Sequence, residues 1–458
     1  MSKSSKSFRC RECGHETVGY MGKCPACQNW NTIEEIEVLK TGAKSKGIAP
    51  VKRDLIKLSN VKSQNSERVK TGLSEFDRVM GGGIVKDSVT ILTAKPGAWK
   101  STLLLQVAQR LADIGHKVLY ASGEESESQI KSRADRILKR IDDNIYVIST
   151  TILEEITSQA SILDVDFLIV DSIQTVVSAE LTSRPGSPTQ TMECANTLVE
   201  LAKNPVRPRV VFIVGQMTKD DELAGVRALE HLVDTVLVMS TDDEQELRML
   251  MATKNRYGAT GEVGFFEMTE EGMVSIDNPS AHFMTVRDGD TKVIGSALTV
   301  IKEGTRPIIL EVESLVSQSY TPYPSRVGEC IRREHLNTLI SLLEERGKLN
   351  LYDKNVVIKT TGGIALREPS SNLAIITSIA SSLKAIGLPV DTIFLADVSL
   401  TGELRGIPML KSRLKEADRM GFKVAYIAKD SIKIDKELSI DVRECNTLKE
   451  VLAKVLNI

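Results

Sequence analysis

The sequence has few aromatic residues and no long apolar run. Aromatic side chains make up 4% of the 458 residues, so the chain offers few ring surfaces for stacking. Apolar runs such as residues 167–170 and 210–214 are far shorter than the roughly 18 residues that a membrane span needs. The first ten residues, MSKSSKSFRC, lack the apolar core of a secretory signal. These absences predict a cytoplasmic protein that does not bind membranes.

Neither sign of charge is in large excess. The chain has 59 Lys and Arg against 61 Asp and Glu, a formal net charge of −2, so any attraction to nucleic acid must be local. Residues 40–70 carry nine basic and two acidic side chains among Gly, Ser, Asn and Pro. This stretch predicts a basic linker, which either contacts a polyanion or is only solvated.

Seven cysteines are too few for a disulfide-rich chain, and in a reducing compartment they are free thiols or metal ligands. Four of them form two C-x2-C pairs separated by ten residues: Cys10, Cys13, Cys24 and Cys27. Four thiolates complete a tetrahedral Zn²⁺ site and leave no open position, so the site would be structural. Four unconnected thiols or a redox pair are the alternatives.

The length suggests two or three domains of roughly 150 residues. From residue 71, short β-rich runs alternate with helical patterns, which is typical of an α/β domain with a mainly parallel sheet. The expected strands are residues 88–93, 117–121, 167–170, 210–214 and 235–239, with helices at 101–114 and 126–138. Near 278–290 the pattern breaks, and strands and helices then resume. The predicted segments are a zinc module (1–36), the basic linker (37–70), the α/β domain (71–280) and a second domain (281–458).

A phosphate-binding loop is expected where the first of these strands meets the first helix. The full pattern, G-x-x-x-x-G-K-[ST], holds phosphates with backbone N–H groups and the helix N-terminus, with Lys on the outer phosphates and Ser on Mg²⁺. The candidate nucleotide-binding residues are Ala94, Lys95, Pro96, Gly97, Ala98, Trp99, Lys100, Ser101 and Thr102.

Both glycines of that pattern are replaced, by Ala94 and Trp99. Ala94 is a small departure. Trp99 places an indole beside Lys100, where glycine lets the backbone approach a phosphate closely. The sequence therefore predicts nucleotide binding with impaired turnover, and a decayed loop on an intact scaffold is the alternative.

Carboxylates follow two of the other predicted strands. Asp171 ends an apolar strand, in the place expected for the acid associated with Mg²⁺. Glu124 and Glu125 follow residues 117–121, where a carboxylate could orient an attacking water. Gln216 follows residues 210–214 and could sense the terminal phosphate. Lys100, Glu124, Glu125 and Asp171 are therefore the candidate catalytic residues.

Several sequence blocks occur together in an informative order. They are the two cysteine pairs, residues 71–79 with glycines 81–83, the phosphate loop, residues 123–126, residues 170–174, and Lys254-Asn255-Arg256-Tyr257-Gly258. Together they resemble the bacterial RadA (Sms) recombination-repair family over essentially the whole chain. The last block is the most specific, although the family usually has Phe where this chain has Tyr257.

The resemblance implies a zinc module, a RecA-like ATPase core, a C-terminal domain similar to the proteolytic domain of Lon, and hexameric rings. It also implies ATP, Mg²⁺ and Zn²⁺ as cofactors and ATP-driven branch migration of DNA in homologous recombination, in partnership with RecA. Residue by residue, Lys100 and Ser101 would hold phosphate and Mg²⁺, and Glu124 would be the catalytic carboxylate. Lys254 and Arg256 would couple nucleotide state to DNA or reach a neighbouring subunit's phosphate; a loop of solvated cations is the alternative.

The C-terminal third permits a further hypothesis. Ser370 and Lys411 lie roughly where a Lon-like peptidase has its nucleophile and base, but the glycines around such a site are absent. An oligomerising or DNA-guiding scaffold is favoured instead. In that case the basic residues Arg405, Lys411, Arg413 and Lys415 could line a DNA channel.

The favoured hypothesis is an ATP-dependent DNA motor that contacts single-stranded or branched DNA through Lys and Arg. Such binding is independent of sequence and weakens steeply with salt. The alternatives are a non-hydrolysing DNA-binding ring or recruitment scaffold and, less favoured, a Ser-Lys peptidase.

Overall fold

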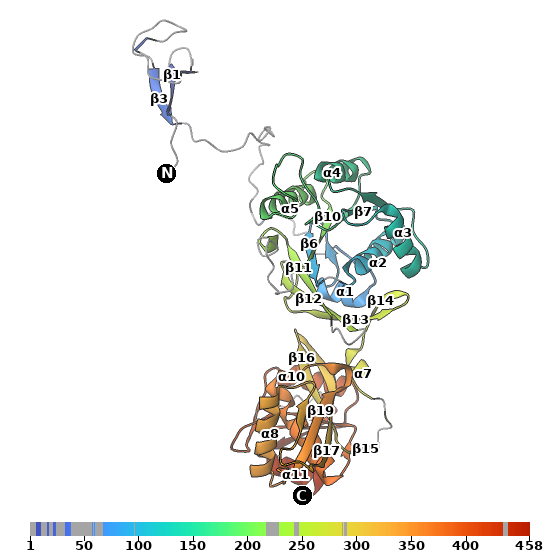
Figure 1. Ribbon diagram of the computed structural model, residues 1–458, viewed down its shortest axis with the longest axis vertical. Helices are drawn as coiled ribbons and strands as arrows, with labels where there is room; N and C mark the ends of the chain where they lie inside the picture. The colour runs from blue at the N-terminus through green and yellow to red at the C-terminus, as the bar shows by residue number, and fades with distance from the viewer. Residues whose placement is uncertain are drawn as a thin grey trace. The chain divides into compact units, whose positions relative to one another are not determined.

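The computed structural model describes residues 67–458 with gaps at 96, 217–228, 242–246, 286, 288–290 and 434–437. Before residue 67 it describes three short strands and residues 22, 23, 57 and 59. The chain separates into two units, Met1–Asn65 and Ser66–Ile458, and each has sheets of its own (Figure 1).

The first unit contains a small antiparallel sheet. Strand β1 (Lys6–Cys10) pairs with β2 (Glu16–Thr17) on one side and β3 (Ile33–Glu37) on the other. Cys10 is the last residue of β1 and lies opposite Ile33 of β3. The other three predicted zinc ligands, Cys13, Cys24 and Cys27, lie outside the described residues.

The second unit contains a nine-stranded sheet in the order β14-β13-β12-β11-β6-β10-β9-β7-β8. Strands β11, β6, β10, β9, β7 and β8 are mutually parallel, whereas β12, β13 and β14 continue the sheet antiparallel. The bounds are β6 (Val89–Ala94), β7 (Val118–Ser122), β8 (Ile145–Ser149), β9 (Phe167–Asp171), β10 (Val210–Gln216), β11 (Thr235–Thr241), β12 (Leu247–Asn255), β13 (Val263–Thr269) and β14 (Gly272–Ser275). A short pair, β4 (Arg68–Val69) and β5 (Ile84–Val85), precedes them.

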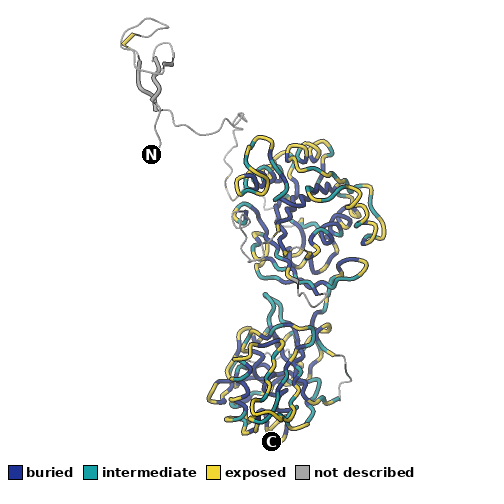
Figure 2. Tube along the Cα trace, in the orientation of Figure 1, coloured by how far each residue is buried: buried dark blue, intermediate teal, exposed yellow. Residues whose placement is uncertain are grey.

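Helices cover both faces of this sheet. Helices α1 (Ser74–Val79), α2 (Lys100–Asp113) and α3 (Glu127–Ile137) pack on one face, and α4 (Leu153–Ile162) and α5 (Pro188–Ala202) on the other. Alternate residues of β6 enter the two cores: Leu92 faces α2, and Ile91 faces α4 and α5. Because both faces are covered, the central strands are buried along their length (Figure 2), which explains their continuous apolar runs.

Local chemistry explains where two of these helices begin. Ser126 caps α3 by accepting a hydrogen bond from the Gln129 amide, and the Gln129 side chain accepts one from the Ser126 amide. Ser187 caps α5, and Pro188 occupies its first position, where no N–H is needed.

A second, seven-stranded sheet follows in the order β18-β19-β17-β16-β21-β24-β25, with parallel and antiparallel pairs. Its strands are β16 (Ser296–Glu303), β17 (Arg306–Gln318), β18 (Arg326–Gly328), β19 (Lys354–Thr360), β21 (Thr392–Leu395), β24 (Val424–Ala428) and β25 (Asp441–Cys445). Helices α8 (Arg333–Glu345), α9 (Asn372–Lys384) and α11 (Leu448–Leu456) share one core, and α10 (Leu410–Arg419) packs in another. Smaller elements are α7 (Pro279–His282), β15 (Lys292–Val293), β20 (Leu388–Pro389), β22 (Asp397–Val398), β23 (Leu404–Arg405), η2 (Thr361–Gly363) and η3 (Pro369–Ser371).

The predicted α/β fold with a mainly parallel sheet is confirmed, and each predicted strand and helix of residues 88–239 has a counterpart within a few residues. Among the described residues, no helix has the length and apolar character needed to cross a bilayer.

Candidate nucleotide-binding site

The phosphate loop connects the centre of the nine-stranded sheet to α2. Strand β6 ends at Ala94 and α2 begins at Lys100, so the loop lies at the carboxyl edge of parallel strands, where ligands of such sheets bind. Two described loop residues have positive φ, Gly97 at 80° and Trp99 at 62°. Pro96 lies outside the described residues.

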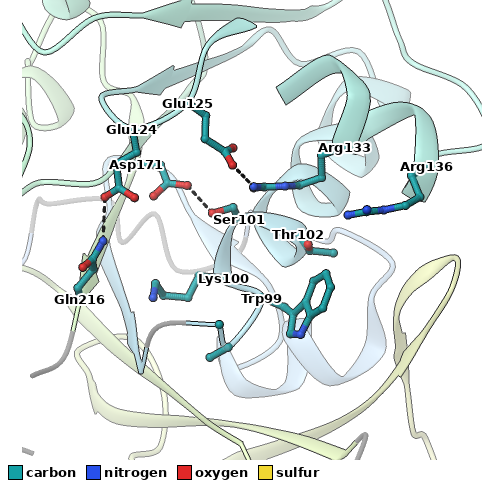
Figure 3. Close-up of a pocket in the computed structure, with 12 residues that line it drawn as sticks. Trp99, Lys100, Ser101, Thr102, Glu124, Glu125, Arg133, Arg136, Asp171 and Gln216 are labelled. Atoms are coloured by element: carbon teal, nitrogen blue, oxygen red, sulfur yellow. Dashed lines mark hydrogen bonds and ion pairs between the residues drawn. The ribbon is translucent and has the colours of Figure 1, made fainter. Parts of the chain in front are cut away.

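Trp99 is the residue before the helix and has a left-handed backbone, which costs a non-glycine residue roughly 1–2 kcal/mol. Its indole and the Lys100 ammonium extend in opposite directions from the loop (Figure 3). Trp99 is 38% exposed. The backbone therefore keeps the conformation that a glycine would adopt, and the ring does not fill the space in front of Lys100.

Lys100 and Ser101 occupy the first turn of α2. The Lys100 side chain is largely buried, and its Nζ donates a hydrogen bond to the carbonyl of Ala94, 3.3 Å away. Burial lowers the pKa of Lys100, against the opposing effect of the Asp171 and Glu124 carboxylates. Ser101 Oγ donates to Asp171 Oδ2 at 2.6 Å, which joins the start of α2 to the end of β9.

Tyr120 contacts the same Asp171 oxygen from a third element, strand β7. Its hydroxyl, in fully buried β7, donates to Asp171 Oδ2 at 2.6 Å. Burial, together with the nearby Asp171 charge, raises the pKa of Tyr120 well above its usual range, so the hydroxyl remains a donor. Sequence reasoning did not identify Tyr120; the available signal is a hydroxyl-bearing ring in the middle of a buried strand.

The two glutamates that follow β7 have different partners. Glu124 Oε1 accepts a hydrogen bond from Gln216 Nε2 at 2.9 Å and another from Ser172 Oγ. Glu125 instead forms an ion pair with Arg133 of α3 (Figure 3). Glu124 is thus aligned with Gln216 at the ends of β7 and β10, whereas the charge of Glu125 is already matched.

These side chains line one cavity of about 370 Å³. It includes the phosphate-loop residues 97–102, both glutamates, Asp171 and Gln216, and also two arginines of α3, Arg133 and Arg136. Sequence reasoning missed the arginines, whose signal is two cations three residues apart on the helix that follows Glu124 and Glu125. The structure brings these predicted nucleotide-site residues to one edge of the sheet.

The donor groups fit the expected cofactors. Ser101 and Asp171 supply hydroxyl and carboxylate oxygens, the ligands that Mg²⁺ prefers, beside the cation of Lys100. The four cysteine thiolates of the first unit fit Zn²⁺ by their chemistry.

The block Lys254–Gly258 lies at the other edge of the sheet. Thr235 of β11 pairs with Thr90 near the start of β6, and antiparallel β12 brings Asn255 opposite Thr235. The block is therefore at the amino edge of the parallel strands, and the phosphate loop of the same chain is at the carboxyl edge.

A buried carboxylate organises that block. Asp234 Oδ1 pairs with Arg256 Nη1 and with Lys203 Nζ, both at 3.0 Å, and its Oδ2 accepts a hydrogen bond from the amide of Val89, the first residue of β6. Lys254 Nζ donates to the carbonyl of Glu230, and burial lowers the pKa of Lys254. Sequence reasoning did not single out Asp234.

The other residues of the block shape the backbone. Asn255 Oδ1 accepts from the Tyr257 amide at 2.9 Å, and its Nδ2 contacts the carbonyl of Val79 at 3.4 Å. A Cβ on Gly258 would lie 3.1 Å from the Cα of Gly81, so a larger residue would fit only if the backbone at Gly81 shifted slightly. Burial and the nearby Asp234 carboxylate raise the pKa of Tyr257 to about 12.

Two sets of contacts count against the C-terminal hypotheses. Ser370 is buried, and its Oγ donates to Glu368 at 2.9 Å and accepts from Arg413 Nη1 at 3.2 Å. Arg413, a cation that does not act as a base, is itself only 2% exposed and pairs with Glu368. Arg413 therefore cannot line a DNA channel, and the expectation for that residue is wrong because its charge is used inside the fold.

The fold and the site define a P-loop ATPase, and comparisons with known proteins agree. A family model described as "AAA domain" matches residues 56–222, and one described as "Rubredoxin metal binding domain" matches residues 8–35, which span all four clustered cysteines. The chain is an ATP-hydrolysing enzyme with Zn²⁺, ATP and Mg²⁺ as cofactors.

Curated relatives identify the family. "DNA repair protein RadA" of Bacillus subtilis is 40% identical over 92% of both chains, that of Streptococcus pyogenes serotype M3 is 40% identical over 100% of both, and that of Listeria monocytogenes is 38% identical over 99% of both. The chain belongs to the RadA family. Among solved structures, the flagellar accessory protein FlaH from Methanocaldococcus jannaschii covers 45% of this chain and 97% of its own at 13% identity, with a TM-score of 0.37, too low to bear on function.

Proposed function

We propose that this protein is an ATP-dependent, DNA-binding motor that processes or branch-migrates recombination intermediates during DNA repair. Its relatives are named DNA repair proteins. We further propose that the protein is cytoplasmic, that it acts with a RecA-type recombinase, and that it binds single-stranded or branched DNA independently of sequence. We also propose that the chain is divided into a zinc module (1–36), a basic linker (37–70), the ATPase domain (71–280) and a domain that resembles the proteolytic domain of Lon (281–458).

The observation that carries the proposal is the hydrogen bond from Ser101 to Asp171, 2.6 Å long, beside Lys100 and within the cavity that also holds Glu124. Lys100 and the amides at the start of α2 would hold the phosphates. Magnesium, held through Ser101 and Asp171, would neutralise charge on the phosphates. Glu124 would orient the attacking water, and Gln216, bonded to Glu124, would respond to the terminal phosphate.

Position supports a role for Lys254 and Arg256 between subunits. They lie at the opposite end of β6 from the phosphate loop of their own chain. Six residues of strand span about 17 Å, beyond the reach of either side chain. A cation of the block that stabilises transferred charge must therefore come from another copy, as in a homo-hexameric ring.

Mixing two inactive variants tests this arrangement. Lys100→Ala removes the phosphate cation, and Arg256→Ala removes the cation proposed to act on a neighbour. Mixed rings would contain some sites that join an intact loop to an intact Arg256, so ATPase activity should return in the mixture. If mixtures stay as inactive as the separate variants, action of Arg256 across subunits is contradicted.

The motor itself is tested by phosphate release with and without single-stranded and branched DNA. We expect stimulation by DNA that disappears as salt rises, because backbone contacts release counterions. Turnover that DNA does not change would contradict the proposal.

A DNA-binding ring or scaffold that turns ATP over too slowly to act as a motor is the second candidate, because Trp99 occupies a left-handed position suited to glycine. Impaired turnover caused by Trp99 remains a prediction, tested by comparing the ATPase rate with that of Trp99→Gly. A rate restored only in the variant would support the scaffold, whereas vigorous turnover in both proteins would exclude it.

A further inference from the structure

A second cavity of about 530 Å³ is lined in part by the same residues as the nucleotide cavity. Its lining is Trp99, Arg136, Ile137, Met268, Thr269, Glu270 and Glu271, so Trp99 and Arg136 belong to both cavities. The last four residues form the end of β13 and its turn into β14. The two cavities are therefore adjacent, and the indole lies where they meet.

The first cavity has distinguishable ends. Glu124 and Gln216, the groups suited to a terminal phosphate and its attacking water, lie on one side of Lys100, and Trp99 and Arg136 lie on the other (Figure 3). A nucleotide with its outermost phosphate at Glu124 must extend its nucleoside past Trp99.

The second cavity is unsuited to phosphates and suited to a ring. The exposed carboxylates of Glu270 and Glu271 would repel phosphate groups, so the uncharged part of a nucleotide is the better occupant. Ile137 and Met268 add apolar surface beside the indole. Among the described residues Arg136 has no ion-pair partner, which leaves its guanidinium available for stacking.

The backbone conformation of Trp99 also favours a ligand-binding role for its side chain. A left-handed backbone in a non-glycine residue is unfavourable, and such strained positions cluster at ligand sites. The Trp99 side chain extends away from Lys100 (Figure 3), and the residue is 38% exposed.

We propose that Trp99 is a stacking platform for the nucleobase of bound ATP and so a nucleotide-binding residue of this ATPase. Arg136 flanks the same base from α3. The inference rests on ATP binding in the neighbouring cavity, and it assigns Trp99 a binding role in place of a purely obstructive one.

Fluorescence can report on the stacking of a base on Trp99, because the chain has only two tryptophans, Trp30 and Trp99. In full-length Trp30→Phe protein all indole emission comes from Trp99. Titration with ADP and Mg²⁺ should quench that emission. Inorganic tripolyphosphate, which offers phosphates without a base, should compete with ADP for the site and cause little quenching.

Affinity supplies the second measurement. The ratio of ATP affinity to tripolyphosphate affinity should fall about tenfold in Trp99→Gly, because a stacked base is lost. Trp99→Phe should retain most of the ratio, since it keeps an aromatic face. Using the ratio removes any gain that glycine brings to phosphate binding by relaxing the backbone.

The outcomes distinguish a failure of the proposed base stacking from a failure of the proposed ATP site. If tripolyphosphate and ATP both bind but ADP leaves the emission unchanged and Trp99→Gly keeps the affinity ratio, the platform is overturned and ATP binding stands. If neither phosphate compound binds, the proposed ATPase site is overturned and the platform with it. Quenching by ADP alone, combined with the fallen ratio, supports the platform.

Discussion

Replacing Tyr120 by Phe tests how Asp171 is held. The substitution keeps the ring in fully buried β7 and removes only the hydroxyl that donates to Asp171 Oδ2 at 2.6 Å. A hydrogen bond to a charged group contributes about 1.5–3 kcal/mol. Ser101 still donates to the same oxygen, so Asp171 keeps one partner. We therefore expect the free energy of unfolding to fall by about 2 kcal/mol.

Urea unfolding of the full chain in the Trp30→Phe background measures this loss, since Trp99 emission then reports on the part that contains the site. The same variant should need about tenfold more Mg²⁺ for half-maximal ATPase activity, because partners that orient a ligand carboxylate commonly change metal affinity by that amount.

Tyr146→Phe is the matched control. Tyr146 is half-buried on adjacent β8, and its hydroxyl has no hydrogen-bond partner in the part of the chain that the structure describes. Its loss should stay within about 0.5 kcal/mol. Equal losses in both variants, or an unchanged Mg²⁺ requirement in Tyr120→Phe, would refute the view that Tyr120 fixes Asp171.

Three other outcomes are expected. Glu124→Gln should lower kcat about 10²–10⁴-fold while ATP affinity changes little, by phosphate release and equilibrium binding; near-normal turnover would remove Glu124 from catalysis. Zinc chelation should make four of the seven thiols react fast with a thiol reagent. The other three should stay protonated until the chain unfolds, because burial raises the pKa values of Cys194 and Cys330 to about 11 and also raises the pKa of Cys445. Seven fast-reacting thiols would contradict the burial of these three. Arg413→Met should lower the free energy of unfolding by about 3 kcal/mol, because Glu368 loses its cation and the carbonyls of Pro408 and Val300 lose their donor. The exposed Arg419→Met should lower it by less than about 1 kcal/mol, and similar losses in both variants would count against the buried pair.

The positions of the strands, and of the site residues that follow them, could be predicted from the sequence. Apolar runs marked the strands, and the rule that ligands gather at the carboxyl ends of parallel strands brought together Lys100, Glu124, Asp171 and Gln216. These positions needed no knowledge of side-chain direction, only of where each strand ends.

Features that depend on which strands are neighbours, and on where a side chain points, could not be predicted from the sequence. The Tyr120 hydroxyl reaches Asp171 because β7 and β9 are adjacent, although the two residues are 51 positions apart along the chain. The block at Lys254 lies far from the phosphate loop because β12 runs antiparallel to β11, which no local pattern indicates. For Trp99, composition reveals the size of the ring but not the side of the loop on which it lies.

Strand β6 joins two chemically different sites through one stretch of backbone. Its last residue supplies the carbonyl that Lys100 contacts, and the amide of its first residue is bound by Asp234, the partner of Arg256. An extended strand that is hydrogen-bonded to neighbours on both sides resists compression, so it can transmit a displacement from one end to the other. A displacement at the nucleotide end would alter the contacts of Arg256 without any helix having to rotate. In the proposed ring, this would pass the nucleotide state of one subunit to the next.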